Sequence, residues 1–235
     1  MSELTDAQGK VHQIELAIDF LESHRKLAEA NRKLLDEHGV TMIDVMGSVG
    51  AGKTSVVEQL VRGLKEKYRI VVLNGDLVTT IDQDRILRHG VEAIQVNTGK
   101  ECHLDAALVR TVLERLDLGN LDLVIVENVG NLICPADFPL GSHRRVVVTS
   151  VTEGPYVAVK HPHVFAEMDF VVINKIDLAS VMEVDVSKLV GDLRSVNPRA
   201  RVVQTSCKDG TGIPELITRL VEEPRRCTSS ESLPA

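Results

Sequence analysis

The chain has 235 residues, enough for one large domain or for one domain with an appendage, and its hydrophobic content of 43% and charged content of 26% are those of an ordinary globular protein. A net charge of −7, an aromatic content of 3% and a complete lack of tryptophan argue against nucleic-acid binding, which needs a basic face or a stacking platform. No apolar run approaches the roughly 18 residues of a membrane-spanning helix, no secretory signal opens the chain, and the four cysteines contain no Cys-x-x-Cys pair. We therefore expect a cytoplasmic protein that binds neither nucleic acid nor a membrane.

The two ends of the chain differ from its middle. Residues 1–39 predict a helical extension, because apolar residues recur loosely on one stripe and Gly39 stands where a helix end favours a left-handed residue. Residues 224–235 are rich in proline, serine and charge, which predicts a disordered tail. Residues 40–223 form the predicted main domain.

Short apolar segments alternate with helix-like segments throughout this main domain. The predicted strands are residues 41–46, 69–76, 92–98, 121–130, 144–151, 170–177 and 201–206. The predicted helices are residues 54–68, 82–90, 102–116, 182–195 and 213–223. Strands that alternate with helices predict an α/β fold with a doubly wound, mostly parallel sheet.

A glycine-rich segment, GSVGAGKT at residues 47–54, lies between the first predicted strand and the helix that follows it. This position, and the Lys53–Thr54 pair after the last glycine, identify a phosphate-binding P-loop. Backbone N–H groups of such a loop point at phosphate oxygens, Lys53 supplies positive charge, and Thr54 offers its hydroxyl to magnesium. The residues that we expect to bind the phosphates are Gly47, Ser48, Val49, Gly50, Ala51, Gly52, Lys53, Thr54 and Ser55.

The segment NKID follows a buried strand, so it lies at the carboxyl end of that strand, where ligands of open α/β sheets bind. It matches the guanine-reading motif of GTP-binding proteins, which implies that Asp177 accepts hydrogen bonds from guanine, Lys175 covers the base and Asn174 braces the loop. Adenine has an amino group where guanine has a carbonyl, so we expect GTP rather than ATP. The alternative is an ordinary strand-to-helix turn. The segment TSCKDG lies where such proteins place a second base-contacting loop, here through the backbone of Ser206 and Cys207.

Magnesium prefers hard oxygen ligands, usually one or two carboxylates together with phosphate and water. Thr54 is the first candidate, and Glu127 stands at the end of the apolar run LVIV, where a Walker-B-like acid belongs. Asp76 ends the second predicted strand and Asp82 lies beyond the loop after it, in the expected place of a switch, and their alternative roles are helix caps and solvated loop acids. Which of these two aspartates contacts magnesium stays open.

For GTP hydrolysis, we assign catalytic roles to Lys53, Glu127 and Asp82. Gly130 can leave its N–H facing the γ-phosphate. The next residue is Asn131, where signalling GTPases carry a glutamine that positions the attacking water. We therefore expect slow intrinsic turnover.

Candidate ligands for a softer metal gather in two segments. Cys102 and His103 are adjacent and are expected to open a helix, whose N-terminus would lower the thiol pKa and favour the thiolate. Cys134 lies seven residues after Glu127, on the loop that leaves the acidic strand. Two cysteines and a histidine suit nickel or zinc but are too few for a closed tetrahedral site, so a second chain could complete it. The alternative is that the Cys-His pair is purely structural.

The segments GSVGAGKT, GKECHLDA, ENVGNLICPADFPLG and NKIDL, in this order, closely resemble those of the hydrogenase nickel-incorporation GTPases, accessory proteins of [NiFe]-hydrogenase maturation. The resemblance covers about residues 40–222, and the family belongs to a dimerising class of P-loop GTPases that includes the urease accessory GTPase. It implies that Cys102, His103 and Cys134 bind nickel or zinc at a homodimer interface, where nucleotide state and metal state are coupled. The implied function is a GTP-hydrolysing nickel metallochaperone, with hydrogenase maturation factors and the hydrogenase large-subunit precursor as partners.

Some features depart from this pattern. Some family members carry an N-terminal cysteine motif or a histidine-rich stretch for storing nickel, and this sequence has neither, so a storage role is not expected. Asp44 interrupts the first predicted strand and could lie near the phosphates or cap a neighbouring loop. His161 and His163 could bind a metal, although an exposed loop pair is the favoured interpretation.

Three other functions compete with this one. A GTPase chaperone for another metalloenzyme such as urease would share the nucleotide motifs, but the segment ENVGNLICPA differs from that of urease accessory proteins. A passive metal-binding module would have no use for intact Lys53, Thr54 and Asp177. A small-molecule kinase is disfavoured because NKID selects guanine and no acceptor site is visible.

Overall fold

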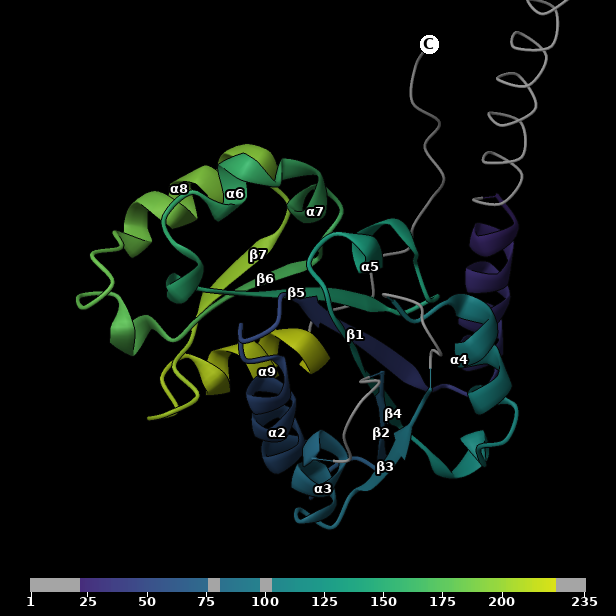
Figure 1. Cartoon of the computed structure of the whole chain (residues 1–235). Helices are drawn as coiled ribbons and strands as arrows, with labels where there is room; N and C mark the ends of the chain where they lie inside the picture. The colour runs from purple at the N-terminus through teal and green to yellow at the C-terminus, as the bar shows by residue number, and fades with distance from the viewer. Residues whose placement is uncertain (1–21, 76–80, 98–102, 223–235) are drawn as a thin grey trace, which may run out of the picture.

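The computed structural model describes residues 22–75, 81–97 and 103–222, which form an α/β molecule around one sheet of seven parallel strands (Figure 1). The strand order is β3-β2-β4-β1-β5-β6-β7. The strands are β1 (Thr41–Gly47), β2 (Ile70–Asn74), β3 (Glu92–Gln95), β4 (Leu123–Gly130), β5 (Arg144–Ser150), β6 (Phe170–Asn174) and β7 (Arg201–Gln204). The predicted α/β fold with a doubly wound, mostly parallel sheet is confirmed.

The helices connect the strands and cover the sheet. The α-helices are α2 (Lys53–Leu64), α3 (Ile81–Leu87), α4 (Ala106–Leu113), α5 (Cys134–Asp137), α6 (Val157–Lys160), α7 (Pro162–Ala166), α8 (Val186–Val196) and α9 (Ile213–Glu222). Short 3₁₀ helices are η1 (Leu118–Asn120), η2 (Val151–Glu153) and η3 (Ile176–Leu178).

Two helices begin later than the sequence predicts, because an aspartate caps each of them. The helix predicted from residue 182 begins at Val186, since the Asp185 carboxylate accepts hydrogen bonds from the backbone N–H groups at the start of α8. The helix predicted over residues 102–116 begins at Ala106, for the same reason, with Asp105 as its cap. The one-turn helices α5, α6 and α7 were not predicted, because a single turn shows no apolar periodicity.

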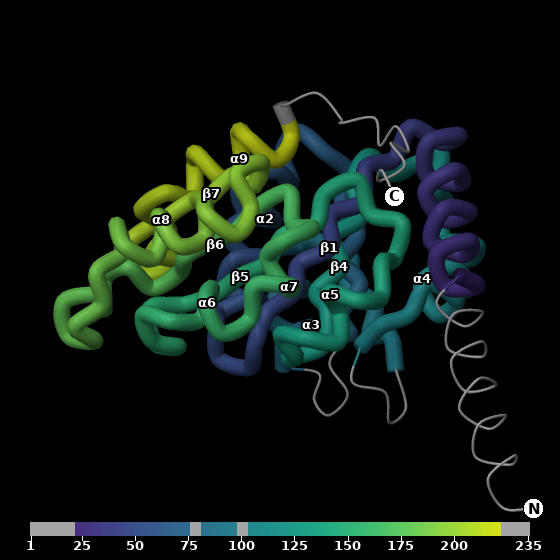
Figure 2. Tube along the Cα trace, turned by 90° about the horizontal axis from the view of Figure 1, so that it is seen from above, coloured from purple at the N-terminus to yellow at the C-terminus, as the bar shows by residue number. Residues whose placement is uncertain are grey.

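Residues 22–37 are helical, and this helix ends before Gly39, which has the predicted left-handed conformation at φ +68°. The helix lies beside α4 in both views of the molecule (Figures 1 and 2). The buried Asn31 joins it to the main domain, because its amide nitrogen donates to the carbonyl oxygens of Ala106 at 2.8 Å and Leu140 at 3.1 Å. The predictions for residues 1–21 and 224–235 lie outside the described residues.

Apolar side chains of the described residues cover both faces of the sheet. One face packs against α2 and α9, through residues such as Leu60 and Leu216. The other face carries two separate clusters, one beneath α4 and the helix of residues 22–37, and one beneath α6, α7 and α8. Successive strand residues alternate between the two faces, which places Met42 in the first of these clusters and Met46 in the second.

Because the strands are parallel, their carboxyl ends meet at one edge of the sheet. β1 ends at Gly47 beside Gly130 of the neighbouring strand β4, and β6 ends at Asn174 two strands away on the other side of β1. The P-loop, the predicted Walker-B-like acid and the NKID segment therefore lie along the same edge. Within the part of the chain that the structure describes, every helix is too short or too polar to cross a bilayer.

Candidate functional site

The P-loop follows β1, and two of its glycines lie close against β5 and β6. A Cβ atom at Gly47 would lie 2.2 Å from the carbonyl oxygen of Val148. Gly52 has φ +99°, and a Cβ atom there would lie 2.3 Å from the side-chain amide nitrogen of Asn174. Neither position has room for a side chain, so the two outer glycines of the motif are required by contacts with β5 and β6.

Lys53 and Thr54 open α2, a helix of 12 residues whose N-terminus faces the loop. A helix N-terminus attracts phosphate because its first backbone N–H groups are unpaired within the helix and its dipole is positive there. The ammonium group of Lys53, largely buried, donates to the Ser48 carbonyl at 3.1 Å. The Thr54 hydroxyl donates to the Glu127 carboxylate at 2.5 Å, so the P-loop helix and β4 are joined at this point.

Glu127 is the most perturbed acid of the site. Its side chain is 4% exposed, and burial raises its pKa to about 7, with a further increase from the charge of Asp82. The hydrogen bond from Thr54 and the charges of Lys53 and Arg85 act in the opposite direction. Among the described residues, its second carboxylate oxygen has no hydrogen-bond partner. A buried, unpaired carboxylate oxygen beside a threonine hydroxyl suits a magnesium ligand, so these residues fit the ion that the sequence implies.

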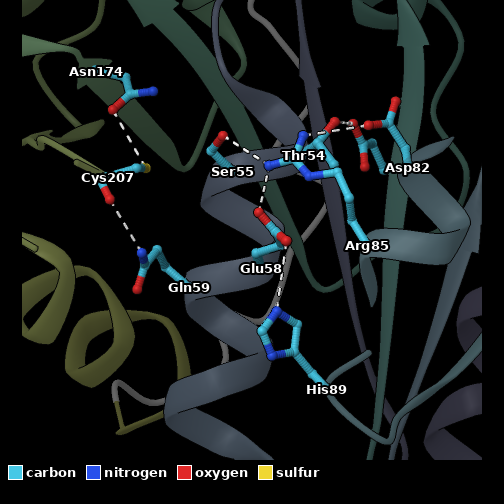
Figure 3. Close-up of polar contacts among 10 residues, drawn as sticks. Thr54, Ser55, Glu58, Gln59, Asp82, Arg85, His89, Asn174 and Cys207 are labelled. Carbon is cyan, nitrogen blue, oxygen red and sulfur yellow. Dashed lines mark hydrogen bonds and ion pairs between the residues drawn. The ribbon is translucent and has the colours of Figure 1, made fainter. Parts of the chain in front are cut away.

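Asp82 lies in the first turn of α3, and Arg85 connects it to the P-loop helix (Figure 3). The Arg85 guanidinium lies 3.4 Å from the Asp82 carboxylate, donates to the Ser55 hydroxyl at 3.2 Å, and forms an ion pair with Glu58. His89 approaches the same Glu58 carboxylate, at 3.5 Å. Arg85 was not singled out in the sequence, although its position three residues after an acid in a predicted helix is a signal for such a pair.

The structure therefore places Lys53, Thr54, Asp82 and Glu127 around one cavity of about 470 Å³. Asp76, the other magnesium candidate, lies outside the described residues. A second cavity of about 350 Å³ adjoins the first and shares Gly52, Ser55 and Lys175 with it. The second cavity is also lined by Glu58, Gln59, Asn174, Asp177, Leu178, Cys207 and Lys208. The two together form a continuous depression from the P-loop to the NKID segment.

Asn174 lines the second cavity and joins the P-loop to the residue that follows β7. Its amide nitrogen donates to the Ala51 carbonyl in the P-loop at 3.1 Å, and its amide oxygen accepts from the Thr205 hydroxyl at 3.1 Å. The next residue, Lys175, has the left-handed backbone conformation at φ 60°, and its ammonium group donates to the Gly50 carbonyl at 2.6 Å. The NKID segment is thus attached directly to the P-loop.

Asp177 is exposed in η3 and lines the second cavity. Cys207 lines it as well, and burial raises the pKa of its thiol to about 11, so this cysteine stays protonated. Its carbonyl accepts a hydrogen bond from Gln59 at 3.2 Å. Ser206 is buried and does not line the cavity, and its backbone N–H donates to the Thr211 carbonyl at 3.0 Å. Of the two predicted backbone contacts, only Cys207 lies at the cavity surface.

His103 belongs to the predicted nickel or zinc site, and its ring is buried. It stacks on the ring of Phe138, with centroids 4.0 Å apart and planes at 18°. Phe138 directly follows α5, whose first residue is Cys134, a free and half-buried cysteine. The stacked rings therefore bring the segment of His103 against the segment of Cys134. Cys102 lies outside the described residues.

The prediction that Cys102 and His103 open a helix is wrong. α4 begins at Ala106, and the carboxylate of Asp105 accepts a hydrogen bond from the Leu108 N–H at 2.7 Å. Aspartate is a much better N-terminal cap than cysteine or histidine, so the helix starts after it. The start of α4 at Ala106 therefore gives no reason to expect a lowered thiol pKa at Cys102. Cys134, predicted on a loop, instead starts the one-turn helix α5.

Three or more His, Cys, Asp or Glu side chains do not converge on a metal-sized space anywhere within residues 22–75, 81–97 and 103–222. His161 and His163 lie where α6 meets α7, and His163 is exposed. Asp44 is fully buried in β1, where it accepts a hydrogen bond from Asn128 at 3.2 Å. It caps no loop, and it lies within a sheet strand three residues before the P-loop begins.

Comparisons with known proteins agree with this geometry. The family model described as CobW/HypB/UreG, nucleotide-binding domain, matches residues 41–204. The probable hydrogenase maturation factor HypB of Methanocaldococcus jannaschii is 47% identical over 213 residues, which cover 89% of this chain and 96% of that protein. The crystal structure of HypB from Archaeoglobus fulgidus is similar at a TM-score of 0.80 and 42% identity, over 85% of this chain and 97% of that one. The crystal structure of HypB from Helicobacter pylori in complex with nickel is similar at a TM-score of 0.82 and 32% identity, over 88% of this chain and 99% of that one.

Proposed function

The chain belongs to the CobW/HypB/UreG family and, within it, to the HypB hydrogenase maturation factors, and from this premise we propose that it is a GTPase that delivers nickel during [NiFe]-hydrogenase maturation. One observation carries this proposal. Glu127, which binds the Thr54 hydroxyl of the P-loop, and Cys134, a candidate nickel ligand, lie on the single continuous segment formed by β4 and α5. A change at the nucleotide can therefore reach the metal ligand through a few residues of backbone.

The nucleotide in this proposal is GTP. The phosphates lie against the P-loop, with the Lys53 ammonium beside them, and guanine lies in the second cavity, where the exposed Asp177 carboxylate accepts from the guanine edge. To cover the base, the Lys175 side chain must break its hydrogen bond to the Gly50 carbonyl or change its conformation while keeping that bond. The bond between Asn174 and Ala51 keeps the base-reading loop in register with the phosphate-binding loop.

Thr54, Asp82 and Glu127 would hold magnesium, with Asp76 as a further candidate outside the described residues. Once bound, the ion would supply positive charge against the charge that develops on the phosphates during hydrolysis. The chain's contribution is to keep the Glu127 carboxylate buried and unpaired at one oxygen, and to hold Asp82 through Arg85 against the P-loop helix. Lys53 completes the charge around the phosphates, and Asn131 in place of glutamine keeps turnover slow.

Nickel is the cargo, and its ligands are Cys102, His103 and Cys134. Three such ligands leave a tetrahedral or square-planar site open, so we propose that two chains meet at this surface as a homodimer, with zinc as the competing metal. The recipients are hydrogenase maturation factors and the hydrogenase large-subunit precursor. Delivery requires that nickel binds the GTP and GDP states with different affinity, because equal affinities would shift nothing.

The test is a titration with nickel chloride, followed by thiolate-to-metal absorbance and by mass in solution, with GDP and with a non-hydrolysable GTP analogue. The proteins are the wild type, Cys102→Ala and Cys134→Ala, with Cys227→Ala as a control that removes a cysteine outside the proposed site. We expect nickel affinity to fall at least about tenfold in the first two variants, to be retained in the control, and to differ between the nucleotides. Nickel binding that ignores both the cysteines and the nucleotide would refute the proposal.

A further inference from the structure

Three polar side chains lie on one face of the sheet, in the gap between its two apolar clusters. They are Asp44 of β1, Asn128 of β4 and Arg145 of β5, and they come from three adjacent strands. Asp44 and Asn128 are 0% and 2% exposed, and the Arg145 side chain is 12% exposed. Period-two alternation places them on the same face as Met42, Met46, Val126 and Val147, which belong to the two clusters on either side.

Asn128 connects β1 to the segment of His103. Its amide nitrogen donates to the Asp44 carboxylate at 3.2 Å. Its amide oxygen accepts from the backbone N–H of Leu104 at 3.1 Å, and from that of Val129 at 3.0 Å. Leu104 directly follows His103, so the backbone beside this candidate ligand is fixed to the strand that carries Glu127.

Arg145 makes the matching connection to the segment of Cys134. It lies opposite Asp44 in the register of β1 and β5, and its charge stabilises the Asp44 carboxylate. Its guanidinium donates to the carbonyl oxygens of Pro135 at 3.1 Å and Ala136 at 2.6 Å. These are the two residues that follow Cys134 in α5.

Such a group of polar side chains is costly in this place. Burial raises the pKa of Asp44 to about 6, and within the described residues one Asp44 oxygen and the Arg145 Nε have no hydrogen-bond partner. Well-packed apolar residues often replace buried charged groups with no loss of stability. Packing therefore does not explain the polar residues at these positions. The hydrogen bonds from Asn128 and Arg145 to the backbone beside His103 and Cys134 do explain them.

We propose that Asp44, Asn128 and Arg145 are positioning residues that hold the backbone beside His103 and beside Cys134 for nickel binding. The inference rests on the proposed function, since it concerns the same nickel site. Residues that orient metal ligands from behind typically change metal affinity by about 10- to 100-fold when they are removed. Because Asn128 directly follows Glu127, the group also connects both ligand segments to the nucleotide side of β4.

The test compares Asn128→Ala with Asn197→Ala in the full chain. Asn197 is also buried, donates to two carbonyl oxygens at 2.9 and 3.0 Å and accepts from two backbone N–H groups, but it lies between α7, α8 and β7, away from the nickel site. The two variants thus lose similar hydrogen bonds. Nickel chloride affinity is measured by thiolate-to-metal absorbance, well below the melting temperature of each variant, and Leu104 amide hydrogen exchange is followed in parallel.

We expect Asn128→Ala to bind nickel at least about tenfold more weakly than the wild type and to exchange the Leu104 amide faster, while Asn197→Ala stays within about twofold. Unchanged nickel affinity in Asn128→Ala, or equal losses in both variants, would overturn the inference. If Asn128→Ala does not fold, Arg145→Met replaces it: methionine has no N–H group to donate to the Pro135 and Ala136 carbonyls, so the same loss is expected and its absence is decisive. If the wild type itself shows no nickel binding that depends on Cys134, the proposed function fails first, and the inference falls with it.

Discussion

Replacing Glu127 with glutamine should stabilise the ligand-free protein while it impairs nucleotide binding. The ordinary pKa of this carboxyl is 4.5, and in the folded chain it rises to about 7, mainly because the side chain is buried. Since the folded-state pKa lies above the unfolded one, protonation favours the folded state, and this stabilisation is complete below about pH 4.5. It is lost as the pH rises through 7. The protein therefore becomes less stable toward alkaline pH because of this single group.

The size of the effect follows from the two pKa values. At about 1.4 kcal/mol for each pKa unit, a rise from 4.5 to about 7 amounts to about 3 kcal/mol. At pH 8 the free energy of unfolding of the Glu127→Gln variant should therefore be about 3 kcal/mol higher than that of the wild type. At pH 5 the same difference should be less than about 1 kcal/mol. Glutamine keeps an acceptor for the Thr54 hydroxyl, so the comparison isolates the charge.

The assay is urea unfolding of both proteins without nucleotide and with a chelator, at pH 5, 6, 7 and 8. All other titrating groups are common to the two proteins, so their effects cancel in the difference. In separate samples with magnesium and no chelator, the magnesium-dependent affinity for a fluorescent GTP analogue should fall at least about tenfold in the variant. A stability difference that is constant from pH 5 to pH 8 would refute the reasoning, because it would mean that the carboxyl is not held in a desolvated site.

Two further substitutions test other contacts of the site, and a third tests an exposed helical position away from it. Arg85→Ala removes the connection between Asp82 and the P-loop helix. The magnesium concentration for half-maximal GTP binding should therefore rise about tenfold, while the affinity for GDP without magnesium stays unchanged. An unaltered magnesium titration would contradict this. Gly52→Ala should cost about 1–3 kcal/mol of stability and most nucleotide affinity, since its φ is positive and its new Cβ would meet Asn174, as denaturation and fluorescence titration would show. Gly191→Ala is the opposite case, a helical position in α8 with nothing within 4 Å, and it should gain about 0.5–1 kcal/mol; a loss there would mean that the helix is packed more tightly than described.

The sequence predicted the fold well where strong local signals agree with tertiary structure. Each predicted strand of the sheet is present, because runs such as LVIV are long, β-branched and buried on both faces. The P-loop and NKID segments were placed correctly at one edge, since parallel strands bring their carboxyl ends together. Helix starts were less predictable. Asp105 and Asp185 cap α4 and α8, so these two helices begin later in the chain than the apolar pattern predicted.

The side-chain contacts of the site were harder to predict, because they join residues far apart in sequence. Asn128 lies inside the segment that was used to identify the family, yet its bonds to Asp44 and Leu104 depend on how β1, β4 and the chain before α4 come together. The role of Asp44 stayed open in the sequence for the same reason. The stacking of His103 on Phe138 likewise follows from the packing of α5, a single turn that leaves no periodic pattern.

The strand order has a consequence for how the sheet is assembled during synthesis on the ribosome. The four strands formed from residues 41–130 are neighbours, in the order β3-β2-β4-β1, and β5, β6 and β7 then join one open edge in the order of synthesis. The N-terminal strands leave the ribosome first, because synthesis proceeds from the N-terminus. The residues of β1 and β4, which bring Gly47 beside Gly130, therefore emerge before those of β5 and β6, whose contacts lie against Gly47 and Gly52 of the P-loop. Asn174 and Asp177, which belong to the proposed base-reading loop, are thus among the last parts of the nucleotide site to emerge, together with Cys207.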